Sequence, residues 1–213
     1  MKELTRTART KIRRLPNRAR YDRDALYAIL DAGFVCHIGY VIDKHPYVTP
    51  TAYWREGDAV YWHGSSKSRM LLALEKAPHA CLTVTHFDAL VVARSGFHMS
   101  VNYRTAMLFG KPYKLREPDE KLAKMEKFVE RVYPGHWMNL RPVNRQELKA
   151  MSVFGMHIDE AVAKVRDGPP IDEPEDYALP IWGGLVPVRQ VLGEPMDDGR
   201  VAAGAPGAPR VAL

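Results

Sequence analysis

Short apolar segments separated by tight turns dominate the first half of the chain and limit the folds open to it. Phe34–Ile42, Tyr47–Trp54 and Ala59–His63 follow one another, with Asp-Lys-His-Pro and Glu-Gly-Asp turns between them. This spacing is typical of antiparallel hairpins, because parallel strands need a long crossover connection. The chain has neither regular strand–helix alternation nor a GxGxxG motif, which argues against a Rossmann fold.

The remaining segments predict further strands, with helices around them. Apolar periodicity and capping signals indicate helices over Asp22–Ala32, Ser66–Lys76, Glu117–Val132 and Asn144–Met151. β-Rich or alternating runs indicate strands over His79–His86, Ala89–Arg94, Met99–Leu115 and, as the last strand, Ser152–Ile158. We therefore predict a mainly β protein with α, an antiparallel barrel with peripheral helices.

Pro50 lies inside the predicted strand Tyr47–Trp54. Proline cannot donate a hydrogen bond to a neighbouring strand, so it is confined to sheet edges and irregular positions. The strand is therefore predicted to have an edge or a break there, which leaves a neighbouring backbone group free.

The basic charge of the chain is concentrated at its N-terminus. The net charge is +6, but residues 1–20 hold eight Lys and Arg residues against the single acid Glu3, and the remainder is nearly balanced. We predict a basic arm over 1–20 that packs on its own protein or is solvated. Binding of RNA or a membrane surface by the arm is disfavoured, because no aromatic residue precedes Tyr21; by composition the arm also resembles a transit peptide.

The domain layout follows from composition along the chain. Residues 21–166 carry the strands and helices and form the predicted barrel domain. Residues 167–192 are a Pro- and Asp/Glu-rich extension that carries Trp182, and the Gly/Ala/Pro-rich residues 193–213 are predicted to be a disordered tail. The isolated cysteines Cys36 and Cys81, with no secretory signal and no transmembrane run, predict a cytoplasmic protein.

The stretch Val60–Leu74 combines a strand end, a glycine and a cluster of donors. Ser66, Lys67 and Arg69 come directly before the apolar run of the predicted helix. Hydroxyls and cations at the start of a helix suit a phosphate group. The alternative is a serine-capped helix with solvated basic residues.

Three motifs in order resemble the pyridoxamine 5′-phosphate oxidase-like flavin-binding family, and more closely its branch that includes the nitroimidazole-resistance (Nim) proteins. The motifs are YVTPTAYW, YWHGSSKSR and VVARSGFHMSVNYRTAMLFG, and the resemblance runs from about Arg13 to Trp182. It implies an antiparallel split β-barrel and a homodimer with one FMN in each of two interface clefts. A deazaflavin or haem, which related split barrels hold, ranks behind FMN.

The resemblance also implies site residues. It implies that the isoalloxazine lies along Thr49, Pro50, Thr51, Ala52 and Tyr53, and that the ribityl chain or ring lies beside His63, Gly64 and Ser65. It implies that the phosphate is held by Ser66, Lys67 and Arg69. Near the cofactor and the interface it implies Asn102, Tyr103, Arg104 and Thr105, and from the other subunit Trp182. Structural alternatives exist for several of them. His63 is equally suited to a hydrogen-bonded strand end, Arg104 to an ion pair with a carboxylate across the dimer, and Trp182 to covering apolar surface.

The predicted function is an FMN-dependent oxidoreductase that passes a hydride or electrons from NADH or NADPH to a small flat acceptor such as a nitro compound. No Ser-His-Asp arrangement and no metal site are predicted, and His63 is the candidate for proton delivery. The first alternative is a flavin carrier or sensor without turnover, and the second is an RNA- or partner-binding protein that uses the arm. Pyridoxamine phosphate oxidase activity itself is in doubt, because no arginine follows Trp182 until Arg189.

Overall fold

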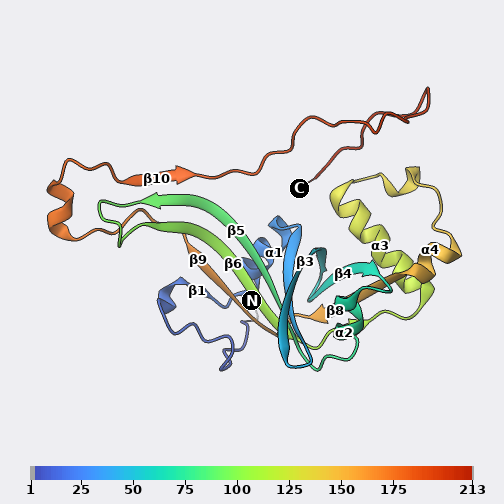
Figure 1. Cartoon of the computed structure of the whole chain (residues 1–213), viewed down its shortest axis with the longest axis horizontal. Helices are drawn as coiled ribbons and strands as arrows, with labels where there is room; N and C mark the ends of the chain where they lie inside the picture. Colours follow the sequence, from blue (N-terminus) through green and yellow to red (C-terminus); the bar gives the residue numbers. More distant parts are fainter. Residues whose placement is uncertain (1–2, 213) are drawn as a thin grey trace.

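The computed structural model describes residues 3–212 and confirms a mainly antiparallel β fold with peripheral helices (Figure 1). Its ten described strands form one open sheet in the order β1-β9-β6-β5-β2-β3-β4-β8-β7, with β10 added beside β5, which is consistent with a split barrel. The strands are β1 (Ala19–Arg20), β2 (Val35–Ile42), β3 (His45–Glu56), β4 (Ala59–Ser65), β5 (Ala80–Val92), β6 (Ser100–Gly110), β7 (Tyr113–Lys114), β8 (Met151–His157), β9 (Glu160–Arg166) and β10 (Gly184–Pro187).

Four α-helices lie around the sheet in the described residues, and most of their ends agree with the sequence signals. They are α1 (Arg23–Ala32), α2 (Arg69–Leu74), α3 (Pro118–Val132) and α4 (Arg145–Ala150), with 3₁₀ turns at Pro16–Arg18, Trp137–Asn139 and Pro174–Ala178. Asp22 caps α1 by accepting from the backbone N of Ala25 at 2.8 Å, and Asn144 and Glu147 form the predicted capping box of α4. No helix in this part of the chain has the length and apolar character that a membrane span requires.

The sequence prediction was wrong in three places. α2 begins at Arg69, not Ser66, because the chain makes a turn in which Ser68 N–H bonds to the Ser65 carbonyl. The two predicted segments 79–86 and 89–94 are one strand, β5, whose register shifts between Phe87 and Ala89. Ser152–Ile158 is not the last strand, because β9 and β10 follow; β9 carries small alanines among charged residues and so lacks a clear period of two.

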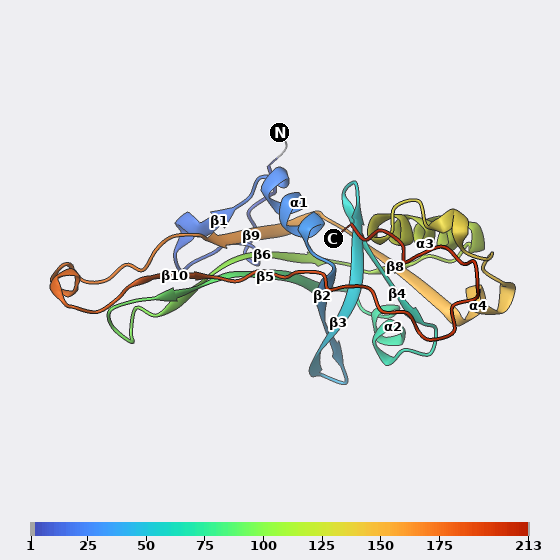
Figure 2. The same ribbon diagram turned by 90° about the horizontal axis from the view of Figure 1, so that it is seen from above.

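The sheet has an apolar cluster on each face at the β3–β4 pair. Alternation along a strand sends Tyr53 and Trp62 into the main cluster with α1, and Trp54 and Tyr61 into a second cluster under α3. Figure 2 shows α1 and α3 beside the sheet, with β5, β6 and β10 extending away to one end. The fold therefore has a helix-covered end and, at the other end, an extended arm made of β10 and the parts of β5 and β6 beside it. This extended part is called the arm below, and residues 1–20 are called the N-terminal arm.

The N-terminal arm packs on its own chain. Leu4 is buried and donates its backbone N–H to the Tyr21 carbonyl at 2.8 Å, the Tyr21 hydroxyl donates to the Thr10 carbonyl, and Arg9 forms an ion pair with Glu160 of β9. Met1 and Lys2 lie outside the described residues, as does Leu213. Residues 193–212 contain no helix or strand, and disorder of this tail stays a prediction.

Candidate functional site

The strands β3 and β4 separate after four paired positions. Tyr53–Glu56 pairs with Ala59–Trp62, but beyond Trp62 the strand β4 pairs only with β8, and residues 45–52 of β3 pair only with β2 in the described chain. One edge of β3 is therefore unpaired along the expected residues Thr49, Pro50, Thr51 and Ala52. The end of β4 that faces this edge consists of His63, Gly64 and Ser65.

The backbone of β3 shows which groups line the open edge. Tyr53 donates its N–H to the Phe34 carbonyl on the β2 side at 3.1 Å. Because successive residues of a strand bond to opposite sides, Val48 and Ala52 direct their N–H groups to the open edge. Pro50 lies on the same side, where its missing N–H breaks no ladder bond, and this confirms the edge predicted from the proline.

Tyr53 differs from the other expected β3 residues. Its hydroxyl donates to the Leu30 carbonyl, its own carbonyl accepts from Arg131 at 3.3 Å, and its ring is fully buried. Burial raises the pKa of Tyr53 above its ordinary value, so the hydroxyl stays protonated. Tyr53 is therefore a core residue that anchors the strand.

The turn after β4 presents charge and hydroxyls, and the backbone donors before α2 are occupied. Ser66 N–H bonds to the Ala150 carbonyl at 2.7 Å and Lys67 N–H to Ser65 Oγ at 3.2 Å. Lys67 and Arg69 are exposed, and the Arg69 guanidinium lies over the Tyr47 ring, 4.9 Å from its centroid. Ser68, the N-cap residue of α2, makes no side-chain hydrogen bond, so this turn does not block the N-terminus of the helix. An anion here would meet the side chains of Ser66, Lys67 and Arg69 beside the first N–H groups of α2.

His63 stands at the inner end of the separation, half-buried against aromatic rings. Its ring centroid is 4.8 Å from Phe128 of α3 and 6.2 Å from Trp54. Its Nδ1 is buried and has no hydrogen-bond partner within residues 3–212. Desolvation lowers the pKa of His63 below its ordinary value, so the ring is neutral at pH 7.

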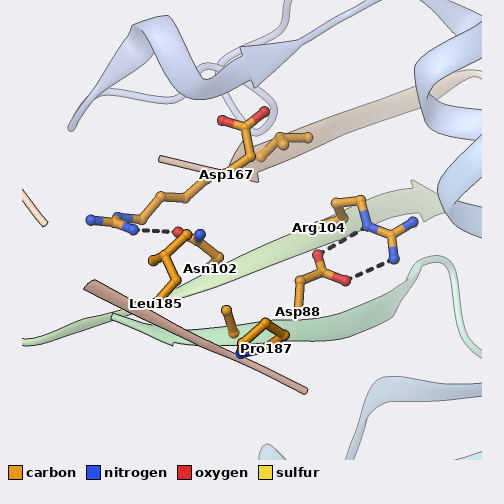
Figure 3. Close-up of a pocket in the computed structure, with 9 residues that line it drawn as sticks. Asp88, Asn102, Arg104, Asp167, Leu185 and Pro187 are labelled. Carbon is orange, nitrogen blue, oxygen red and sulfur yellow. Dashed lines mark hydrogen bonds and ion pairs between the residues drawn. The ribbon is translucent and has the colours of Figure 1, made fainter. Parts of the chain in front are cut away.

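The expected residues on β6 lie in the arm and are partnered within the chain. Arg104 donates to both oxygens of Asp88 at 3.0 and 2.8 Å, and these hydrogen bonds hold the pKa of Asp88 below its ordinary value. The buried Arg166 donates to Asn102 Oδ1. Figure 3 shows both pairs at a pocket of about 360 Å³ between β5, β6, β9 and β10. The ion pair of Arg104 lies within one chain, whereas the sequence suggested either the cofactor or a carboxylate across a dimer as its partner.

Sequence reasoning missed the acidic and basic partners in this pocket. Asp88 lies at the β5 register shift, Arg166 ends β9, the strand that was not predicted, and Asp167 follows it. No motif marks these residues, and only strand pairing brings them together. Thr105 is also engaged, since its hydroxyl donates to the Val84 carbonyl at 2.8 Å; Tyr103, the fourth expected residue of this strand, is half-buried beside it.

One protomer does not bring the two groups of expected residues together. Trp182 is 62% exposed and precedes β10, which pairs with the outer half of β5. Figure 1 and Figure 2 place β10 and the outer ends of β5 and β6 at one end of the molecule, and β4, α2 and α3 at the other. The arm residues and the β3–β4 residues thus form two separate half-sites.

Comparison with known proteins identifies the family. The profile described as pyridoxamine 5′-phosphate oxidase matches residues 22–165, which is more than half of the chain. The chain belongs to the pyridoxamine 5′-phosphate oxidase-like family. This confirms the resemblance seen in the motifs. No curated protein matches the chain in a sequence search.

Two solved structures of this family resemble the protein over nearly their full length. The flavocytochrome Anf3 from Azotobacter vinelandii is 43% identical, with a TM-score of 0.91, over 95% of this chain and 94% of that one. The FAD and haem binding protein from Mycobacterium smegmatis is 35% identical, with a TM-score of 0.84, over 89% and 93%. A protein from Bacteroides thetaiotaomicron assigned to 5-nitroimidazole antibiotic resistance is 18% identical, with a TM-score of 0.59, over 69% and 86%, and shares the fold.

Proposed function

We propose that the protein is a redox flavoprotein that holds FMN or FAD between the open edge of β3 and the turn after β4. The observation that carries the proposal is that the unpaired edge of β3, which contains Pro50, lies next to a turn that bears Lys67 and Arg69. Because the 35% identical relative is named as binding FAD, the proposal includes FAD as well as FMN.

The residues present fit such a group. Two backbone N–H groups of β3, those of Val48 and Ala52, face the open edge and suit the polar rim of a flat ring. Lys67 and Arg69 supply charge-assisted contacts to a phosphate. A bound flavin supplies hydride and single-electron chemistry, and the protein supplies orientation and electrostatics.

We further propose that the site is completed by a second copy of the chain, which brings its arm with Asn102, Arg104 and Trp182 to the other half-site. The separation of the two half-sites in one protomer supports this, as do the exposed apolar side chains of the arm. These include Phe97, Met99, Leu90 and Val101, which are 90%, 52%, 45% and 39% exposed. A homodimer would cover this surface.

The test of flavin binding is absorption of the purified protein, followed by titration of stripped protein with FMN and with FAD. Lys67→Ala and Arg69→Ala should each weaken binding by about 1.5–3 kcal/mol, the usual worth of a hydrogen bond to a charged group. Lys111→Ala, which removes an exposed cation from the β6–β7 connection, is the matched control. A colourless protein that takes up neither flavin overturns the proposal.

Mixed dimers test the shared site. A subunit with Lys67→Ala and Arg69→Ala is coexpressed with a subunit bearing Trp182→Ala. If each cleft combines the turn of one copy with the arm of the other, one cleft in such a dimer carries every substitution and the other carries none. We expect one flavin per mixed dimer; two weakened clefts per dimer would place both half-sites in the same subunit.

Turnover is proposed with NADH or NADPH as the donor and a small flat acceptor, including nitro compounds. His63, at the end of β4 beside the open edge, is the proposed proton carrier; because its lowered pKa leaves the ring neutral at pH 7, it accepts a proton before it passes one on. Bleaching of the flavin by either nicotinamide, with recovery on adding an acceptor, supports an enzyme. A flavin that binds but is reduced by neither donor supports a carrier or sensor instead.

Haem binding at His63 is a second candidate function. A neutral imidazole nitrogen without a hydrogen-bond partner is free to ligate haem iron, and Nδ1 of His63, set among apolar rings, has no partner within the described chain. The 43% identical relative is a flavocytochrome and the 35% identical one binds haem. Haem would supply single-electron and oxygen chemistry.

Titration with hemin tests this second function. A ligated haem should give a sharp Soret band that is lost in His63→Gln and kept in His98→Gln, a histidine that lies in the arm beside Glu173. A Soret band that is unchanged in His63→Gln would assign the ligand to another residue.

A further inference from the structure

A row of aromatic side chains crosses four adjacent strands beneath α3. Trp54 of β3 and Tyr61 of β4 are direct cross-strand partners, with ring centroids 5.7 Å apart. His63 lies two residues further along β4, and its ring is 6.2 Å from Trp54. Tyr113 of β7 continues the row, 6.5 Å from Tyr61 and edge-on to it. All of these spacings lie in the range of aromatic rings in contact.

Gly155 lets the row pass over β8. It is the register partner of both Tyr61 and Tyr113, so it stands between them in the sheet. A Cβ at this glycine would lie 2.6 Å from the Tyr113 ring and hydroxyl. With no side chain there, Tyr113 lies across the strand, and its hydroxyl donates to the Tyr61 hydroxyl at 3.3 Å.

Charged groups beside the row are placed to move protons. Trp54 Nε1 donates to one oxygen of Glu56 at 2.8 Å, and the other oxygen of Glu56 accepts from Lys124 at 2.7 Å. The Lys124 ammonium lies over the Tyr61 ring, 4.4 Å from its centroid. An indole that loses an electron becomes a strong acid, so a carboxylate at hydrogen-bond distance makes its oxidation easier.

The row runs from the candidate redox site to the surface. Trp54 is 1% exposed and Tyr61 9%, Tyr113 is half-buried, and the Tyr113 ring is stacked at 5.1 Å on the exposed His157. We propose that Trp54, Tyr61 and Tyr113 form an electron-transfer route that carries oxidising equivalents from a redox group at His63 to the protein surface. The route rests on the proposed function, because that group is the source of the oxidising equivalents.

Each step of the route balances. An electron leaves Trp54 for a photoexcited flavin or a haem oxidised by hydrogen peroxide, which is thereby reduced by one electron, and the Nε1 proton passes to Glu56. Tyr61 then gives its electron to Trp54, Glu56 returns the indole proton, and the Glu56 carboxylate takes up the proton of Tyr61 beside the Lys124 ammonium that lies over the Tyr61 ring. Tyr113 gives Tyr61 one electron and one proton along their hydrogen bond. The net result is a Tyr113 phenoxyl radical and one proton on Glu56, and a small thiol or ascorbate in solution restores Tyr113.

Trp62 provides a matched control for ordinary aromatic packing. It is adjacent to Tyr61 in the chain and fully buried, but it faces the main cluster and stacks on Phe154 at 6.1 Å. Its Nε1 has no partner among the described residues, so it lacks a proton acceptor. Trp62→Phe therefore changes a buried tryptophan without touching the row.

The test compares wild-type protein with Trp54→Phe, Tyr61→Phe and Trp62→Phe. Flavin and haem contents are first measured by absorption, and thermal unfolding confirms that each variant is folded. The bound group is then oxidised with hydrogen peroxide where haem is present, or excited with blue light where only flavin is present. Samples are frozen and examined by electron paramagnetic resonance, with ring-deuterated tyrosine to assign the radical.

We expect a tyrosyl signal in wild type and Trp62→Phe, and its loss in Trp54→Phe and Tyr61→Phe at equal cofactor content. Tyr61→Phe removes only a hydroxyl, so it keeps the test sound if Trp54→Phe does not fold. An unchanged signal in Tyr61→Phe, or no signal in a cofactor-loaded wild type, overturns the route alone. A wild type that binds neither flavin nor haem overturns the proposed function, and the route with it.

Discussion

Arg69 and Tyr47 connect the two walls of the candidate site, because the Arg69 guanidinium lies 4.9 Å from the centroid of the Tyr47 ring. Tyr47 belongs to the open-edged half of β3, and Arg69 begins α2 directly after the donor-rich turn. A cation over an aromatic face is attracted by the ring quadrupole. This contact therefore fixes the spacing between the strand edge and the turn before any ligand binds.

Replacing Tyr47 should separate the structural role of this pair from its binding role. Tyr47→Leu should lower the free energy of unfolding by about 0.5–1 kcal/mol, the worth of an exposed cation–π contact, and Arg69→Ala should lower it similarly. Flavin affinity should fall far more in Arg69→Ala, because Tyr47→Leu keeps the charge. Urea unfolding and FMN titration measure the two effects; equal losses of affinity in both variants would show that Arg69 does not contact the phosphate.

Much of the helix-covered end follows from local sequence, and the arm does not. Asp22, Pro50 and the Asn144–Glu147 pair each act on backbone groups close to them in the sequence, so their effects can be predicted from the sequence alone. Arg166 and Asp88 depend on the pairing of β6 with β9 and β5, which joins residues more than a dozen positions apart. Register of that kind is set by tertiary packing and leaves no motif.

The site divides along the same line. The turn from Ser65 to Arg69 was recognisable, but the bond of the Ser66 N–H to the Ala150 carbonyl was not, because α4 lies beside the turn only in the fold. The contact between Phe128 of α3 and His63 could not be predicted either, because a helical pattern indicates an apolar face but not the residues on which that face packs. Local chemistry was predictable, and its surroundings were not.

His63 should make stability depend on pH. Its folded pKa is lowered by desolvation, so the unfolded chain binds a proton more readily than the folded one. Stability rises with pH wherever the unfolded state binds more protons. Burial of the neutral His63 ring therefore lowers the free energy of unfolding progressively as the pH falls below the ordinary pKa of 6.5 towards the lowered folded pKa. In His63→Gln this part of the dependence should vanish, as measured by chemical unfolding between pH 7.5 and pH 5.

If the pH dependence is the same in His63→Gln as in wild type, another group is responsible. His98→Gln is the matched control, because His98 is also half-buried but lies in the arm, 3.6 Å from Glu173 and away from Trp54 and Phe128. Cofactor-free protein is needed for both, since a ligand on His63 would itself alter the titration.

Asn102 should be required for stability through Arg166. The buried guanidinium of Arg166 donates to Asn102 Oδ1 and to the carbonyls of Gly168 and Pro169. Asn102→Leu leaves one buried donor without an acceptor and should cost about 1–3 kcal/mol of unfolding free energy. Asn102→Asp keeps an acceptor and should cost less, and Ser100→Ala, at an exposed position of the same strand, should cost little. Equal losses in Asn102→Leu and Asn102→Asp would point to packing instead.

Asp172 and Arg94 hold the C-terminal extension on the tip of the arm. The Asp172 side chain is fully buried and accepts from the Arg94 backbone N at 2.9 Å and from Nη1 at 3.0 Å, and the guanidinium also lies over Tyr177. β10 follows this contact and pairs with β5 from Gly184 onward. The ion pair thus positions the strand and, with it, Trp182.

Asp172→Ala should therefore release β10 while the rest of the sheet stays intact. Amide hydrogen exchange of a peptide covering 184–187 should become faster, and a peptide covering β8 should be unchanged, because opening would be local. Asp172→Asn keeps an acceptor for the Arg94 backbone and should show a smaller change; Glu175→Ala, at an exposed position of the same extension, is the control. Unchanged exchange in Asp172→Ala would mean that the β10–β5 hydrogen bonds alone hold the extension, and Trp182 would then keep its place without the ion pair.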